Sequence, residues 1–164
     1  MTLTLTNLRN EGEKPMCNMK LLREFIGNRQ LKTIADIILD GEEGDYYIEK
    51  LNEIQKTIEA MPGVYQSEDS YERKAFLHYF MGSCDWYIFE KDTVENEPQL
   101  QAFGFACING DRENAELGYV CIEDVINHAH AEIDLHYEPE TMREILTKFG
   151  KTWHIEEEKE VENA

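Results

Sequence analysis

The pattern of hydrophobic and polar positions divides the chain into a helical first part and a strand-rich remainder. Between residues 18 and 62, apolar positions recur at spacings of three and four, the period of amphipathic helices. This pattern predicts three helices, which end before Gly27, before Gly41 and before Pro62. Because each helix is apolar on one face only, each needs a surface to cover.

Between residues 74 and 137 the apolar runs become short, rich in aromatic and β-branched residues, and interrupted by Gly, Asn, Asp and Pro. Such runs are typical of β-strands. Their short connections favour antiparallel pairing, because parallel neighbours need a crossover of about a dozen residues or more. Gly104 and Gly118 lie inside runs, which indicates bulges or close backbone approach. The expected strands are residues 74–81, 85–90, 100–108, 116–121 and 131–137, with a short helix over 122–129.

Particular residues are expected to begin and end the helices. Asn18 and Asp45 have side chains that cap helix N-termini, and they precede the first and third apolar stripes. Pro139 is expected at the first position of a last helix, which Gly150 would stop.

Together these elements predict an α+β fold: N-terminal amphipathic helices packed on a mostly antiparallel sheet of about five strands, with a C-terminal helix and an acidic tail. The tail from His154 onward carries five glutamates, so we expect it to be frayed. Translation could start at Met1, Met16 or Met19. The expected organisation is a loose leader over 1–17, one domain over 18–150 and the tail over 151–164, the domain holding helices at 18–62, the sheet region at 74–137 and a helix at 139–149.

The net charge restricts the kinds of partner. The 164 residues include 34 acidic and 16 basic side chains, a formal charge of -18. That charge disfavours direct binding to nucleic acid or to an anionic membrane, both of which attract Lys and Arg. It favours a basic protein surface, and it also serves solubility.

The sequence also indicates a compartment. No apolar run approaches the roughly 18 residues of a membrane span, and residues 1–14 lack the pattern of a signal peptide. We therefore expect a cytoplasmic protein. In a reducing compartment the cysteines, which form no CxxC pair, are expected to be buried thiols rather than disulfides. They are Cys17, Cys84, Cys107 and Cys121.

The strongest candidate for chemistry is the stretch 128–136, which is rich in histidine and carboxylates. Such side chains bind divalent transition metals. On a straight strand, however, His130 and His136 would stand about 20 Å apart and could not share one ion. A solvated polar strand face is therefore favoured, and no catalytic residue or cofactor is assigned. The weak metal candidates are His128, His130, Glu132, Asp134 and His136, of which the last four would share one strand face.

A second candidate is a Cys–His nucleophile pair across the first hairpin. Cys84 follows the expected turn, and His78 lies one strand away. Nothing around Cys84 resembles an activating motif, so a structural thiol is favoured. Phosphate-loop, dinucleotide-binding, zinc-protease and nucleophile-elbow motifs are also absent from the sequence. Without these motifs the sequence gives no positive evidence for those enzyme classes, but an enzyme is not excluded.

Four segments carry a resemblance to a known family. They are Asp85-Trp86-Tyr87, Ala102-Phe103-Gly104, Glu116-Leu117-Gly118-Tyr119 and Glu132-x-Asp134-Leu135-x-Tyr137-x-Pro139. In order and spacing, residues 75–145 resemble the uncharacterised domain-of-unknown-function family 2958, and residues 21–61 look like the leader of some plasmid-borne members. Members occur on plasmids, integrative elements and phages, often near conjugation and anti-restriction genes. The resemblance implies no reaction and no catalytic residue; it implies a mobile-element context and a role against host defences.

The leading hypothesis is a non-enzymatic, strongly acidic interaction protein of a mobile genetic element. It would bind a basic nucleic-acid-handling protein, such as a host nuclease or defence complex, as an anti-CRISPR or anti-restriction inhibitor that mimics DNA. The acidic residues are scattered through helices, loops and tail, however, and solubility explains the composition as well. Two alternatives stay open: a metal-dependent or hydrolytic enzyme using the strand from His128 to His136, and a structural module that self-assembles through an exposed aromatic sheet face. The oligomeric state also stays open.

Overall fold

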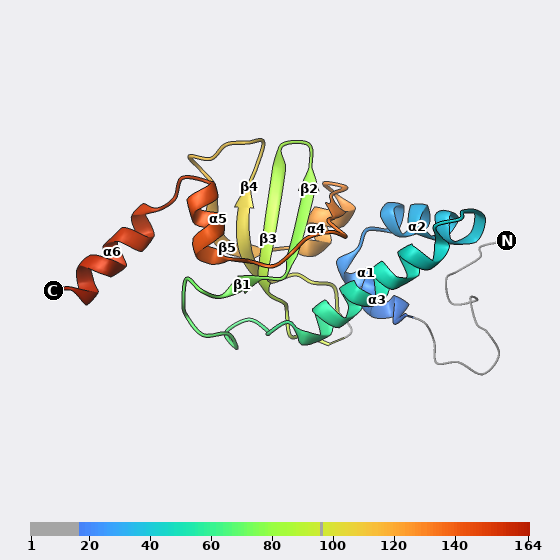
Figure 1. The fold of residues 1–164 in the computed structure, drawn as a ribbon, viewed down its shortest axis with the longest axis horizontal. Coiled ribbons are helices and arrows are strands. Elements are labelled where there is room, and N and C mark those ends of the chain that lie inside the picture. Colours follow the sequence, from blue (N-terminus) through green and yellow to red (C-terminus); the bar gives the residue numbers. More distant parts are fainter. Residues whose placement is uncertain (1–16, 96) are drawn as a thin grey trace.

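The computed structural model describes residues 17–95 and 97–164 and confirms the predicted α+β class. Met1, Met16 and the expected leader before Cys17 lie outside the described residues. In chain order (Figure 1) the elements are α1 (Met19–Phe25), α2 (Asn28–Asp40), α3 (Gly44–Ala60), β1 (Lys74–Ala75), β2 (Leu77–Met81), β3 (Cys84–Glu90), β4 (Ala102–Cys107), β5 (Glu116–Val120), α4 (Ile122–Asn127), β6 (Glu132–Ile133), β7 (Glu140–Thr141), α5 (Met142–Lys148) and α6 (Trp153–Glu162).

The five-stranded sheet has the order β5-β4-β3-β2-β6, and each pair of neighbours is antiparallel. The hairpin between β2 and β3 turns at Gly82, whose φ of 56° favours glycine. This turn sets the register in which Leu77 faces Ile88 and Met81 faces Cys84. A separate two-stranded sheet joins β1 to β7.

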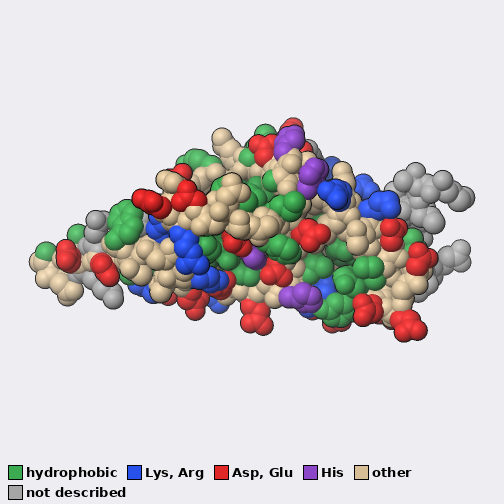
Figure 2. All heavy atoms as spheres, turned by 90° about the horizontal axis from the view of Figure 1, so that it is seen from above, with side chains coloured by type: hydrophobic (Ala, Val, Ile, Leu, Met, Phe, Trp, Pro, Cys, Tyr) green, Lys and Arg blue, Asp and Glu red, His purple; other side chains and the backbone are tan. Residues whose placement is uncertain are grey.

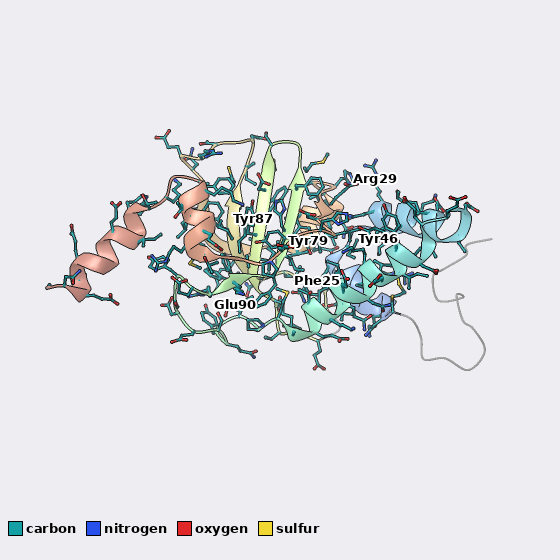
Figure 3. The ribbon with its side chains drawn as sticks, in the orientation of Figure 1. Phe25, Arg29, Tyr46, Tyr79, Tyr87 and Glu90 are labelled. Atoms are coloured by element: carbon teal, nitrogen blue, oxygen red, sulfur yellow. The ribbon has the colours of Figure 1, made fainter. Side chains whose placement is uncertain are left out.

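Helices cover the two faces of the sheet unequally. On the first face, Tyr79, Trp86 and Ile88 pack in one cluster with apolar residues of α1 to α4. The buried Tyr79 hydroxyl donates a hydrogen bond of 2.6 Å to the Phe25 carbonyl and so joins β2 to α1 (Figure 3). On the second face, α5 and the start of α6 cover Phe105 and its neighbours in a second cluster. The two clusters make the sheet the middle layer of the domain.

Several expected element ends are wrong. The expected strand over 74–81 is divided at Phe76 into β1 and β2, because β1 turns to pair with β7. Pro139 does not begin the last helix, since the residues after it form β7. Instead Thr141 caps α5, and Glu144 completes a capping box with it. Gly150 follows the helix with a φ of 73°, as its predicted role as a stop requires.

Asn18 caps α1 as predicted, because its Oδ1 accepts a hydrogen bond of 3.1 Å from the Leu21 N–H. Asp45 does not cap α3; it lies in the first turn, where its charge complements the helix dipole. The tail is helical where fraying was expected, since α6 covers Trp153–Glu162 and Ile155 is buried in the second cluster. Among the described residues, no helix is long and apolar enough to cross a membrane.

Candidate functional site

Among the described residues, the second face of the sheet is uncovered at its β2 end. Phe80, which lies on this face near the tip of the hairpin, is 39% exposed. Three polar residues from separate segments meet beside it: His78 of β2, Asp85 of β3 and Asp134 after β6. We refer to His78, Asp85 and Asp134 as the imidazole–carboxylate cluster. The hairpin register makes Asp85 the diagonal neighbour of His78 on this face.

In the imidazole–carboxylate cluster, a carboxylate lies beside each ring nitrogen of His78. The distance from His78 Nε2 to Asp85 Oδ1 is 2.8 Å, and that from His78 Nδ1 to Asp134 Oδ2 is 3.4 Å. The imidazole side chain is 14% exposed, and the carboxylate side chains are 31% and 32% exposed. The cluster therefore holds two partly solvent-accessible carboxylates around a largely buried ring.

Aromatic rings form the inner wall of the site. The Tyr87 ring stacks on the His78 ring with centroids 4.5 Å apart and planes 15° apart. The Tyr137 ring lies 5.5 Å from His78 and 6.0 Å from Tyr87. Burial raises the pKa of both tyrosine hydroxyls, so both are neutral at physiological pH.

The cation next to this wall already has an anionic partner. Lys148 Nζ lies 5.2 Å from the centroid of the Tyr87 ring and 2.6 Å from Glu140 Oε2. Burial alone would lower the pKa of Lys148, but its hydrogen bond to Glu140 and nearby charge raise the pKa above its usual value. Lys148 therefore stays charged, and Glu140 balances it. The accessible charge of the site is that of Asp85 and Asp134.

The buried tyrosines predict a loss of stability at alkaline pH. Burial raises the pKa of Tyr79, Tyr87 and Tyr137 in the folded protein, whereas the unfolded chain releases these protons near pH ~10. Their contribution is therefore complete below about pH 10 and falls as the pH rises further. Urea unfolding between about pH 8 and 11 should show this fall, and Tyr137→Phe should reduce it. If all three tyrosines titrate at their ordinary pKa in the folded protein, the predicted loss of stability at alkaline pH is wrong.

The five weak metal candidates do not converge. His128 pairs with Asp124 at 2.8 Å on the surface of α4, while His136 lies beside Tyr46, with ring centroids 6.2 Å apart. Asp134 contacts His78. Within 17–95 and 97–164, no group of three His, Cys, Asp or Glu residues could hold a metal ion. His130 lies between α4 and β6 with a φ of 54°, and Glu132 lies exposed on β6.

The strand expected over 131–137 exists but is much shorter than predicted, because only Glu132 and Ile133 pair with β2. After them the Asp134 carboxylate accepts a hydrogen bond of 2.9 Å from the His136 N–H, which turns the chain out of the sheet. The alternation that would align His130, Glu132, Asp134 and His136 therefore does not occur. Asp134 is the member of this stretch that enters the candidate site.

The proposed pair of Cys84 and His78 does not form. Cys84 packs with the first cluster, while His78 points to the second face and contacts Asp85. Asn109 is the partner of Cys84, since its N–H lies 3.3 Å from Cys84 Sγ. All four cysteines are free thiols. The role of Asp85 went unpredicted, although counting residues from the turn at Gly82 places it, not Cys84, on the face of His78.

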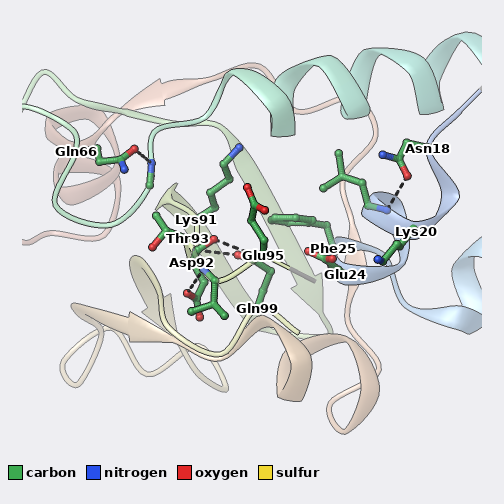
Figure 4. Close-up of a pocket in the computed structure, with 13 residues that line it drawn as sticks. Asn18, Lys20, Glu24, Phe25, Gln66, Lys91, Asp92, Thr93, Glu95 and Gln99 are labelled. Carbon is green, nitrogen blue, oxygen red and sulfur yellow. Dashed lines mark hydrogen bonds between the residues drawn. The ribbon is translucent and has the colours of Figure 1, made fainter. Parts of the chain in front are cut away.

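A separate cavity of about 460 Å³ lies between α1 and the loop from Lys91 to Gln99 (Figure 4). Its polar groups mainly hold the loop in place. Lys91 Nζ donates a hydrogen bond of 2.6 Å to the Ile58 carbonyl at the end of α3. The buried Gln99 accepts one of 2.8 Å from the Asp92 N–H and donates back to the Asp92 carbonyl. Burial raises the pKa of Glu24 at the rim. These hydrogen bonds give the polar residues of the cavity a structural role in holding the loop.

On the face drawn in Figure 2, acidic side chains are spread out rather than gathered in one patch. Charge alone therefore does not mark a site, and the arrangement around His78 is the more specific feature. Comparison with family models, with curated proteins and with solved structures gives no match for this chain. The resemblance to the domain-of-unknown-function family 2958 accordingly stays a prediction.

Proposed function

We propose that this protein is a non-enzymatic interaction protein that binds a basic surface of a partner protein. The uncovered β2 end of the sheet would receive a cationic side chain of that partner. The observation that carries this proposal is the pair of accessible carboxylates, Asp85 and Asp134, held on either side of His78.

The chemistry of this surface suits a guanidinium group. Carboxylates bind arginine through short, charge-assisted hydrogen bonds, and the planar group also stacks on aromatic rings. Phe80 is exposed next to His78, with ring centroids 6.0 Å apart, and Tyr137 lies on the inner side. An arginine could therefore contact a carboxylate with its edge and an aromatic ring with its face. The formal charge of -18 would steer a basic partner toward the protein before these contacts form.

Proteins that handle nucleic acids carry basic surfaces of the required kind. A nuclease or a defence complex is thus a suitable partner, and occupation of its basic groove would mimic DNA. The mobile-element and anti-defence setting rests on the resemblance described above. The chemical part of the proposal, recognition of a cationic side chain, rests on the imidazole–carboxylate cluster.

The test compares two double variants that remove the same charge. Titration with a short arginine-rich peptide should show binding at least about tenfold weaker for Asp85→Asn with Asp134→Asn than for the unchanged protein, because charged hydrogen bonds contribute about 1.5–3 kcal/mol each. The control is Glu42→Gln with Glu43→Gln, at the exposed turn between α2 and α3. It should change affinity by about twofold at most.

Calorimetric titration at low and at physiological salt would measure both effects. Binding should weaken as salt rises, because charge attraction drives the encounter. Equal losses of affinity in the two double variants would contradict a specific site. They would indicate diffuse attraction to the acidic surface instead.

A further inference from the structure

The two edges of the five-stranded sheet differ in whether the outward-facing backbone N–H and C=O groups have hydrogen-bond partners. At the β6 edge, the side chain of Gln30 on α2 takes the place of a neighbouring strand. Its Nε2 donates to the Ile133 carbonyl, and its Oε1 accepts from the Ile133 N–H, each at 2.9 Å. This edge is therefore closed to another chain, as exposed sheet edges commonly must be.

Among the residues that the structure describes, nothing closes the β5 edge in this way. In the described part of the chain, β4 is the one strand that pairs with β5, in a register from Ala102 opposite Val120 to Ala106 opposite Glu116. In an antiparallel ladder, alternate residues turn their N–H and C=O groups away from the partner strand. None of the hydrogen bonds of turns, loops and caps within 17–95 and 97–164 reaches the backbone of β5.

The sequence of β5, Glu-Leu-Gly-Tyr-Val, also lacks the usual protection of an edge. It contains no proline and no lysine, and Glu116 is its one charged residue. A Cβ atom built on Gly118 would meet nothing within 4 Å, so one face of the sheet is open over the middle of the strand. Tyr119 is 58% exposed, although its hydroxyl contacts that of Tyr65. The strand therefore presents both backbone groups and apolar surface to an approaching chain.

A cavity of about 480 Å³ adjoins this edge, where a side chain of an added strand could enter. Phe105, Leu117 and Leu146 provide its apolar lining. Glu113 also lines the cavity, and its carbonyl accepts a hydrogen bond of 2.6 Å from Lys151 Nζ. Strand alternation turns the Glu116 side chain to the opposite face of the sheet. Successive side chains of an added strand would point alternately to the two faces of the sheet. Every second side chain would therefore point toward the face that holds the cavity.

We propose that β5 is a strand-addition site, which takes an extended basic segment of a partner protein as a sixth strand. This inference rests on the proposed function for the charge of the partner, since the chain carries a formal charge of -18. Main-chain hydrogen bonds would supply affinity. The apolar lining of the cavity would favour apolar residues on one face of the added strand, and the exposed Glu116 would favour cationic residues on the other. A second copy of this chain is disfavoured as the occupant, because its equal charge would repel.

The test uses a basic peptide of about six residues that alternates valine and arginine, together with versions N-methylated on one or the other alternate set of residues. N-methylation removes N–H donors of the peptide and leaves its charge unchanged. With the unmodified peptide, hydrogen exchange followed by NMR should slow about tenfold or more at outward-facing amides between Glu116 and Val120. At least one methylated version should lose this protection. Equal protection by all versions, or protection elsewhere only, would overturn the inference.

The same measurements on the Asp85→Asn, Asp134→Asn variant separate the two proposals. Slower exchange in β5 that persists in this variant supports the strand-addition site even if the cation site fails. A different outcome would refute the strand-addition site: methylated peptides bind as tightly as the parent peptide, and this binding is lost in the variant. The proposed function would then still stand. Sedimentation without peptide tests the occupant: a dimer with protected β5 amides would overturn the choice of a basic partner.

Discussion

Replacing Gly104 with alanine is expected to lower the free energy of unfolding by about 3 kcal/mol or more, whereas Gly118→Ala should cost nothing. The two glycines are direct cross-strand partners in β4 and β5. A Cβ atom on Gly104 would lie 2.3 Å from the Tyr87 carbonyl oxygen and 3.2 Å from Ile88 Cδ1. Because the nearer atom belongs to the backbone of β3, the sheet itself would have to move.

This close approach accompanies the register shift between Ile88 and Glu90, where β3 has an extra residue opposite β4. Gly118 has open space instead, and alanine there should stabilise the strand by about 0.5–1 kcal/mol through lower backbone entropy in the unfolded chain. Urea unfolding of the two variants measures the difference. Similar stability of both would contradict the described packing of β3 against β4.

Phe105→Ala is expected to cost about 3–5 kcal/mol, whereas Phe80→Ala should cost about 1 kcal/mol or less. Both side chains project from the second face of the sheet. Phe105 is completely buried, and its ring centroid lies 5.1 Å from that of Phe149, the residue that follows α5. Truncation would leave a cavity under α5. Phe80 is 39% exposed at the hairpin tip, where no comparable cavity would form.

Measurement of both variants by urea unfolding also tests whether the β2 end of the sheet is accessible. A large loss of stability in Phe80→Ala would mean that this end is covered, and a cationic side chain could not then reach the imidazole–carboxylate cluster. A loss confined to Phe105→Ala would agree with the uneven cover that α5 provides.

The sequence predicts the helical part of the fold well because its signals are local. The apolar stripes and their stops at Gly27, Gly41 and Pro62 place α1 to α3 within a few residues of their ends. Aromatic runs predict β3 and β4 for the same reason. The errors arise where distant segments decide the structure, as when β7 pairs with β1 and shifts the start of α5 past Pro139.

The candidate site was harder to predict because its members come from distant segments. Asp85 is within reach of sequence reasoning, since the hairpin register follows from the turn at Gly82. Asp134 is separated from His78 by 56 residues, and the adjacency of β6 and β2 is a long-range contact with no local signal. The sequence pattern predicts one strand face for His130, Glu132, Asp134 and His136, whereas these side chains disperse once the chain leaves the sheet after Ile133.

The most direct test of the central claim maps where a cationic probe contacts the protein. Titration of the labelled protein with an N-methylated arginine peptide, chosen because it cannot pair fully with a strand edge, can be followed by two-dimensional NMR. The largest changes in chemical shift are expected at the backbone of His78, Asp85 and Asp134 and in the His78 ring, with smaller changes elsewhere. Changes confined to the acidic turn between α2 and α3 or to α6, with the His78 resonances unmoved, would contradict it.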